Sequence, residues 1–134
     1  MKRKDGQNRP RALGTTAFTE LSSTNPNETR RFLEEAFGWK FDTVEMPMGQ
    51  YLTHQSREGG SVGIRPARGS EPPRSTNYVL VDDLEAAEKK VRQKGGEIVL
   101  PRTDILDMGS FFWFKIPAGP VMACWQDAPR TRKD

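Results

Sequence analysis

A repeated spacing along the chain constrains its fold more than any other feature of the sequence. Asn25 and Gly38, at the expected start and end of a helix, stand 13 residues apart, and Asp82 and Gly95 show the same spacing 57 residues later. A fixed offset of this kind is typical of two copies of one structural unit. One such unit cannot bury both faces of its sheet, so we expect each copy to need its own helix and the other copy.

The first copy, residues 13–66, has the pattern of a strand, a helix and three further strands. Alternating apolar and polar residues over 16–24, rich in Thr, predict the opening strand. Asn25, Pro26 and Glu28 then form a capping-box arrangement, which predicts a sharp helix start. Three extended runs separated by turn residues follow: 39–45, 50–55 and 61–65.

The second copy, residues 76–127, repeats the order after a polar connector rich in Pro and Gly at 67–75. We expect a strand over Asn77–Val81 and a helix over Leu84–Lys94. Its remaining extended runs are 97–100, 110–116 and 121–126. The sequence therefore predicts one α+β domain over 13–127, built as tandem βαβββ units that form a curved mixed sheet.

The net charge of +3 comes from the ends of the chain. Residues 1–11 carry +4 and residues 127–134 carry +1, so the body carries −2. Basic ends of this kind are typical of disordered tails, and we assign residues 1–12 and 128–134 to tails, with no nucleic-acid partner. No apolar run is long enough for a membrane span and no secretory signal follows the basic start, so we expect a cytoplasmic protein with no membrane partner.

Four segments of the chain together resemble the vicinal oxygen chelate superfamily, in its glyoxalase and bleomycin-resistance branch. They are FTELSSTNPNETRRF at 18–32, FGW at 37–39, VDDLEAAEKKVRQKGGEIVLP at 81–101, and the strand that follows IPAGP at 116–120. The resemblance covers about residues 15–127. It implies the glyoxalase-like fold and a cup that holds a small molecule.

The resemblance also implies positions for a metal ion, which active members hold through His, Glu or Gln side chains on the first, fourth, fifth and eighth strands. Such a site needs nitrogen or oxygen donors that converge from separate strands. The corresponding residues here are poor ligands: Phe18, Gly63, Thr76 and Ala123. We therefore expect no metal and no other cofactor.

Strand alternation predicts which side chains face the cup. If Ala17, Thr19 and Leu21 face the first helix, the alternate residues of that strand face the other way. The cup-facing candidates from both copies are Phe18, Glu20, Tyr78, Leu80, Ala123 and Trp125. They suit a flat, apolar or aromatic small molecule.

Glu20 is the candidate catalytic residue of this set. A carboxylate among apolar walls would have a raised pKa and could act as an acid or a base. The alternative is a carboxylate paired with an Arg or with backbone donors. His54, the only histidine, is expected to be a satisfied strand residue, and the only cysteine, Cys124, a small buried apolar residue.

Three function classes stay open at this point. The first is a metal-independent enzyme related to lactoylglutathione lyases, and the second is a binding or sequestering protein of the bleomycin-resistance type. The third is a scaffold that acts through its basic tails. The absence of metal ligands favours the binding protein over the enzyme. The fold alone does not decide between these functions.

We also predict a two-fold homodimer, because paired sheets of this kind leave strand edges or apolar flanks that a second chain can cover. Light scattering at micromolar concentration should then give twice the chain mass of 15.2 kDa. A mass of one chain would contradict the prediction.

Overall fold

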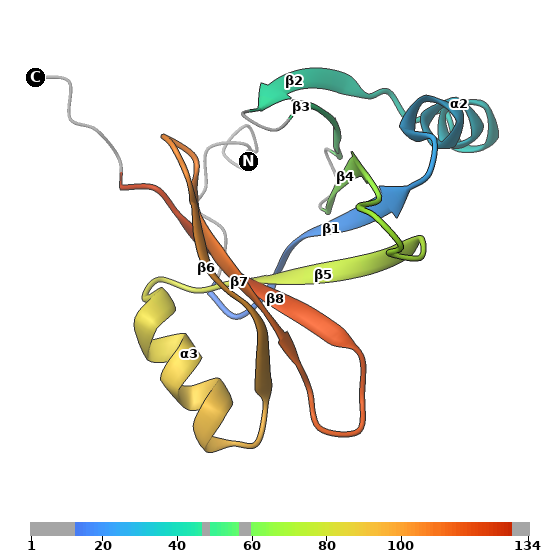
Figure 1. The fold of residues 1–134 in the computed structure, drawn as a ribbon. Coiled ribbons are helices and arrows are strands. Elements are labelled where there is room, and N and C mark those ends of the chain that lie inside the picture. Colours follow the sequence, from blue (N-terminus) through green and yellow to red (C-terminus); the bar gives the residue numbers. More distant parts are fainter. Residues whose placement is uncertain (1–12, 47–48, 57–59, 130–134) are drawn as a thin grey trace, which may run out of the picture. The chain divides into compact units, whose positions relative to one another are not determined.

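The computed structural model describes residues 13–46, 49–56 and 60–129, and Figure 1 shows its elements in chain order. Residues 1–12 and 130–134, which make up most of the predicted tails, lie outside the described residues. The elements are β1 (Thr16–Ser23), α2 (Pro26–Phe37), β2 (Asp42–Met46), β3 (Gly49–Gln55), β4 (Ser61–Pro66), β5 (Arg74–Leu80), α3 (Leu84–Gln93), β6 (Glu97–Ile105), β7 (Gly109–Lys115) and β8 (Val121–Asp127).

The chain divides into two compact units. The contiguous unit comprises Phe18–Asn77, and the described part of the split unit comprises residues 13–17 and 78–129. Gly14 and Thr15 belong to the split unit because both bond to the end of β5: the Gly14 amide donates to the Leu80 carbonyl at 2.7 Å, and the Leu80 amide donates to the Thr15 carbonyl at 2.9 Å.

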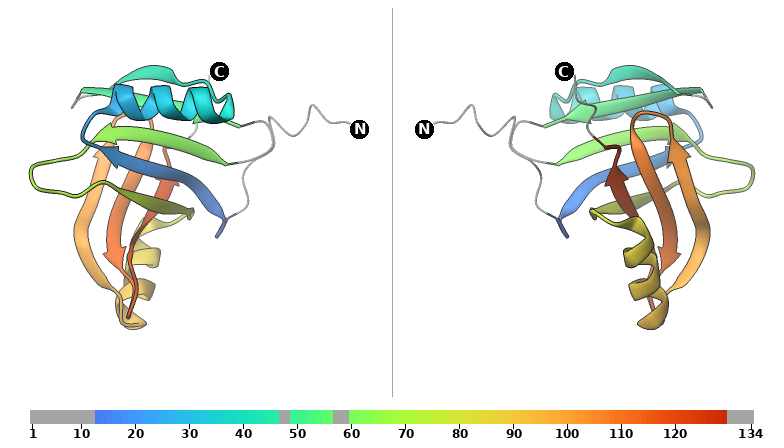
Figure 2. Two further views of the ribbon diagram at one scale, coloured as in Figure 1. Left: turned by 90° about the vertical axis from the view of Figure 1, so that its right-hand side faces the viewer. Right: turned by 90° about the vertical axis from the view of Figure 1, so that its left-hand side faces the viewer.

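In the contiguous unit the strands lie in the order β2-β3-β4-β1. β1 runs parallel to β4, while β3 is antiparallel to both β2 and β4. α2 packs on one face of these strands (Figure 2). The core between them is apolar and consists of Phe41, Leu52 and Ile64, joined by Leu21, Leu33, Trp39 and Val62.

The start and end of α2 confirm the capping prediction. The Asn25 side chain accepts from the Glu28 amide at 3.2 Å, and Pro26 occupies the first turn, where its missing N–H costs nothing. Gly38 ends the helix in the left-handed region, with φ of 74°, which a residue without a Cβ adopts easily.

The split unit repeats the same pattern in the order β5-β8-β7-β6. β5 runs parallel to β8, and β7 is antiparallel to β6 and β8. α3 packs on these strands through a core of Leu84, Phe112, Phe114 and Cys124, with Val81, Ala87, Val91, Ile98, Ile116 and Met122 against it. The α+β class and the tandem βαβββ order are therefore confirmed.

Two details of the sequence interpretation need correction. The cap of α3 is Asp83 and not Asp82, because the Asp83 side chain reaches the Ala86 amide, three residues on, at 3.0 Å. β6 extends to Ile105, beyond the predicted end at Leu100. The extension was not predicted because Pro101 is unfavourable inside a strand. The strand accommodates this proline with shifts of register between Ile98 and Thr103.

No helix in the described ranges is long and apolar enough to cross a membrane.

Candidate functional site

The alternation predicted for β1 gives the contiguous unit two different faces. Leu21 packs into the apolar core with Leu33 of α2. Because successive side chains of a strand point to opposite faces, Glu20 and Ser22 lie on the face away from α2. On β4 the same rule places Ile64 in the core and Arg65 on the face away from α2.

Glu20 is buried on that face and both of its carboxylate oxygens are bonded. Arg65 donates from Nε to Oε1 at 3.0 Å, and the Tyr51 hydroxyl donates to Oε2 at 3.1 Å. Glu20 and Arg65 are each only 8% exposed, so this ion pair is shielded from water. Of the two alternatives for Glu20, the structure shows the carboxylate paired with an Arg.

Arg65 also binds a second carboxylate, which comes from the connector. Its Nη1 donates to Glu71 Oε1 at 2.9 Å, and its Nη2 donates to Glu71 Oε2 at 2.7 Å. This two-pronged contact is the geometry that an arginine makes best with a carboxylate. Nη1 also donates to the Pro66 carbonyl at 3.1 Å, and Arg74 lies 3.3 Å from Glu71 Oε2.

The hydrogen bonds between Arg65 and Glu71 stabilise the charged forms of both side chains. The hydrogen bond from Arg65 lowers the pKa of Glu71 to about 2, although partial burial acts in the opposite direction. The hydrogen bond to Glu71 likewise raises the pKa of Arg65 above its usual value, so the guanidinium stays charged. We call these five side chains the Arg65 network: Glu20, Tyr51, Arg65, Glu71 and Arg74.

Gly63 makes room for one member of the Arg65 network. It is the β4 partner of Glu20 in the register, and a Cβ built on Gly63 would overlap the hydroxyl of Tyr51. The Tyr51 side chain therefore crosses over Gly63 to reach Glu20 from β3. Any larger residue at position 63 would block this path.

In the split unit, the face away from α3 carries an aromatic cluster. Its members are Tyr78, Phe111, Trp113 and Trp125, from β5, β7 and β8. Phe111 and Trp125 stack with ring centroids 6.2 Å apart, and Phe111 meets Tyr78 edge-on at 5.9 Å. The polar edges of both indoles are bonded, since Trp113 Nε1 donates to the Tyr78 hydroxyl at 2.9 Å and Trp125 Nε1 donates to Asp127 at 2.7 Å.

Ala123 explains how two of these rings can meet. It is the β8 residue paired with Tyr78 of β5 on one side and with Trp113 of β7 on the other. Because its side chain is a single methyl group, the bond between Trp113 and Tyr78 can span the strand between them. Two residues further along β8, Trp125 pairs with Leu80 of β5 on one side and with Phe111 of β7 on the other.

The predicted site residues thus fall in two places. Tyr78, Leu80, Ala123 and Trp125 are neighbours in the split unit, as the register shows. Phe18, which is half-buried, and Glu20 lie on β1 in the contiguous unit. That the two sets serve one ligand stays a prediction.

The partners of these residues were not identified from the sequence. Phe111 and Trp113 lie within a run of consecutive aromatic residues, which hides the alternation, and only the register with β8 assigns their face. Glu20 bonds to Tyr51 and Arg65, which are far from it in the sequence, and Arg65 bonds to Glu71 in the irregular connector. No local spacing in the sequence predicts these contacts.

His54 and Cys124 have ordinary structural roles. His54 Nδ1 lies 3.0 Å from the Lys40 carbonyl oxygen, and its ring stacks on Trp39 with centroids 4.8 Å apart. Cys124 lies in the core beneath α3, where burial raises the pKa of its thiol to about 11. Across residues 13–46, 49–56 and 60–129, no three His, Cys, Asp or Glu side chains gather in a group that could hold a metal ion.

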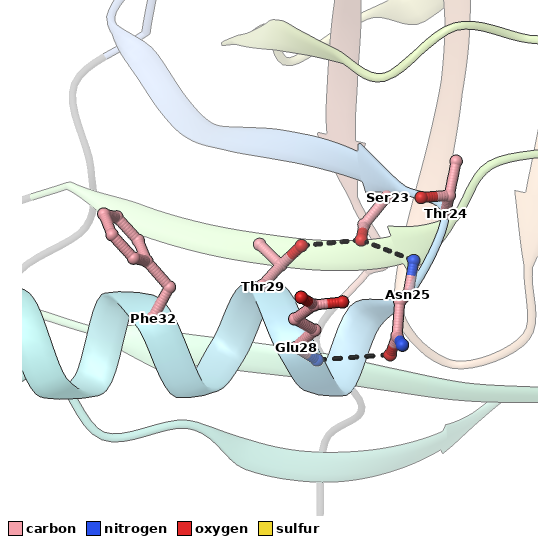
Figure 3. A pocket seen from close by; sticks show the side chains of 6 residues that line it. All are labelled: Ser23, Thr24, Asn25, Glu28, Thr29 and Phe32. Atoms are coloured by element: carbon pink, nitrogen blue, oxygen red, sulfur yellow. Dashed lines mark hydrogen bonds between the residues drawn. The ribbon is translucent and has the colours of Figure 1, made fainter.

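A shallow groove at the start of α2 contains none of the predicted residues (Figure 3). Ser23, Thr24, Asn25, Glu28, Thr29 and Phe32 line it. Its polar atoms serve the helix cap: the Ser23 hydroxyl lies 2.6 Å from that of Thr29 and accepts from the Asn25 amide at 3.0 Å. The groove is therefore accounted for by the capping of α2.

No protein-family model matches the chain. Among curated proteins it is 29% identical over 119 residues to "Putative glyoxylase CFP32" of Mycobacterium tuberculosis, covering 84% of this chain and 46% of that protein. It is also 29% identical over 131 residues to "Anthracycline biosynthesis protein DnrV" of Streptomyces peucetius, covering 86% of this chain and 48% of that protein. The chain thus spans about half the length of these relatives.

Solved structures show the same fold at low sequence identity. A glyoxalase/bleomycin resistance protein/dioxygenase superfamily member from Vibrio splendidus superposes with a TM-score of 0.60 at 18% identity, over 82% of this chain and 97% of that one. Methylmalonyl-CoA epimerase from Mycobacterium tuberculosis superposes with a TM-score of 0.64 at 10% identity, over 88% and 94%. The chain has the vicinal oxygen chelate fold, as its strand order, its two capped helices and these relatives agree.

Proposed function

We propose that this glyoxalase-like chain binds a flat, mostly apolar small molecule through the aromatic cluster, and that it does so without a metal ion. The observation that carries the proposal is the set of four aromatic rings on one face of the split unit, of which only that of Trp113 is partly exposed. Aromatic rings bind flat ligands by stacking, and few polar groups are needed to orient such a ligand. The names of the relatives, a glyoxylase and an anthracycline biosynthesis protein, agree with a small-molecule role.

The other residues of the predicted site have supporting roles in this proposal. Leu80 and Ala123 are buried beside the aromatic rings and would help to fix the positions of these rings. The predicted roles of Phe18 and Glu20, which lie on β1 in the contiguous unit, remain part of the proposal. The homodimer remains a proposal that rests on strand edges or apolar flanks that a second chain could cover.

Catalysis by Glu20, as in an enzyme related to lactoylglutathione lyases, is the competing function. An acid or base must have an oxygen available for the proton that it moves. In this structure one oxygen of Glu20 accepts from Arg65 and the other from Tyr51. A proton transfer at Glu20 would first have to displace one of these bonds, and the geometry therefore favours binding.

A loss of affinity in Trp125→Ala tests the aromatic cluster. With anthraquinone-2-sulfonate as a flat probe, titration calorimetry should show binding to the wild type and a loss of about 1 to 3 kcal/mol in the variant, which is roughly 5- to 150-fold. Trp39→Ala is the matched control, because Trp39 stacks on His54 in the contiguous unit. Circular dichroism should show that both variants are folded.

Two outcomes would count against the proposal. One is a wild-type chain that binds none of a panel of flat aromatic probes. The other is an equal loss of affinity in Trp39→Ala and Trp125→Ala, which would point to a general loosening of the fold.

A structural role for the Arg65 network predicts a specific dependence of stability on pH. The pKa of Glu71 is about 2 in the fold against 4.5 normally, so its stabilising effect is complete above pH 4.5 and disappears as the pH falls towards 2. At pH 7, Glu71→Gln should lower the free energy of unfolding by about 1 to 2 kcal/mol, less than the full pKa shift implies because water screens part of the interaction.

Urea denaturation between pH 7 and pH 3 checks this dependence. The difference between wild type and Glu71→Gln should shrink steadily below pH 4.5. Glu35→Gln, an exposed site on α2, should change the free energy of unfolding little at any pH. A difference at Glu71 that stays constant over the range would refute the electrostatic explanation.

A further inference from the structure

The residues at the metal positions implied by the fold do not fit a metal ion in the contiguous unit. Phe18 offers no donor atom and Gly63 no side chain, while Thr76, a residue that is 2% exposed, offers only a hydroxyl. Divalent ions such as zinc or manganese require several imidazole, thiolate or carboxylate donors around one point. These three residues supply none.

The space beside Gly63 is also filled. The position that a Cβ at residue 63 would take is occupied by the hydroxyl of Tyr51. A ligand side chain from β4 therefore could not extend into this space while Tyr51 bonds to Glu20.

The carboxylate on this face already has a cation. Arg65 Nε lies 3.0 Å from Glu20 Oε1, and the two groups are buried together. A second cation brought to Glu20 would be repelled by the guanidinium across a few ångströms of poorly screened space. Both partners of the pair would have to separate before a metal could bind.

Arg65 makes the connections that a bound metal would otherwise make. Through Glu20 it ties β4 to β1, and through Glu71 it ties β4 to the connector that leads into β5. Tyr51 adds β3 to the same carboxylate. A divalent ion joins separate strands in the same way, by drawing oxygen atoms from each of them to one positive centre.

We infer that Arg65 is a built-in cation that links β1, β4 and the connector as a bound metal would, and that the wild-type chain binds no divalent metal at Glu20. The inference concerns the contiguous unit and does not depend on the aromatic cluster, so a failure of ligand binding and a failure of this inference are distinguishable. Removing the guanidinium leaves the carboxylates of Glu20 and Glu71 facing the space that it occupied. Oxygen ligands of this kind suit Mn²⁺.

Mn²⁺ binding, measured by electron paramagnetic resonance, tests the inference. The wild type should bind no Mn²⁺ with a dissociation constant below about 1 mM, whereas Arg65→Gln should bind it at least about tenfold more tightly, because affinity for hard cations follows the charge of the ligand set. The gain should disappear in the double variant Arg65→Gln, Glu20→Gln. Arg31→Gln, on the surface of α2, controls for the loss of one positive charge and should show no gain.

Two results would overturn the inference. The first is a wild-type chain that binds one Mn²⁺ or Zn²⁺ in a manner abolished by Glu20→Gln. The second is a folded Arg65→Gln variant that gains no Mn²⁺ affinity.

Should Arg65→Gln be recovered unfolded, two other measurements decide. Arg65→Lys keeps the positive charge and should fold without binding Mn²⁺. Thermal melts of the wild type should not shift on addition of Mn²⁺, and a shift that Glu20→Gln removes would contradict the inference.

Discussion

The buried guanidinium of Arg65 is the interaction on which the polar side of the contiguous unit depends. Placing a charge out of water is costly unless hydrogen bonds and opposite charges surround it. Here the cost is offset by the carboxylates of Glu20 and Glu71 and by the Pro66 carbonyl. Because the partners come from β1 and the connector, the cation can be satisfied only when these segments have folded around β4.

Because side chains alternate along each strand, the two faces of the strands in each unit carry different kinds of side chain. One face carries aliphatic and aromatic side chains and packs against its helix. The other carries the Arg65 network in the contiguous unit and the aromatic cluster in the split unit. The helix side thus provides stability through burial of apolar surface. The opposite side carries the specific polar and aromatic contacts, and most of its side chains are also buried. The proposed function follows from this division, since the aromatic cluster is not needed to hold α3.

The sequence predicted the fold well because the fold is signalled by short-range features. The Asn25 cap, the Gly38 end and the alternation of β1 each depend on residues a few positions apart. The Arg65 network could not be predicted in this way, because Tyr51 and Arg65 lie 31 and 45 residues from Glu20. The face of Phe111 was equally hidden, since its neighbours in the chain are also aromatic. Such contacts are set by strand register, which one sequence does not display.

A double-mutant cycle between Glu20 and Arg65 tests the central claim most directly. The free energy of unfolding is measured for the wild type, Glu20→Gln, Arg65→Gln and the double variant. A buried, hydrogen-bonded ion pair predicts a coupling energy of about 2 to 3 kcal/mol, because each single variant leaves the other residue charged, buried and without its bond to the changed side chain. Additive effects, with a coupling near zero, would show that the two charges do not depend on each other and would contradict the account.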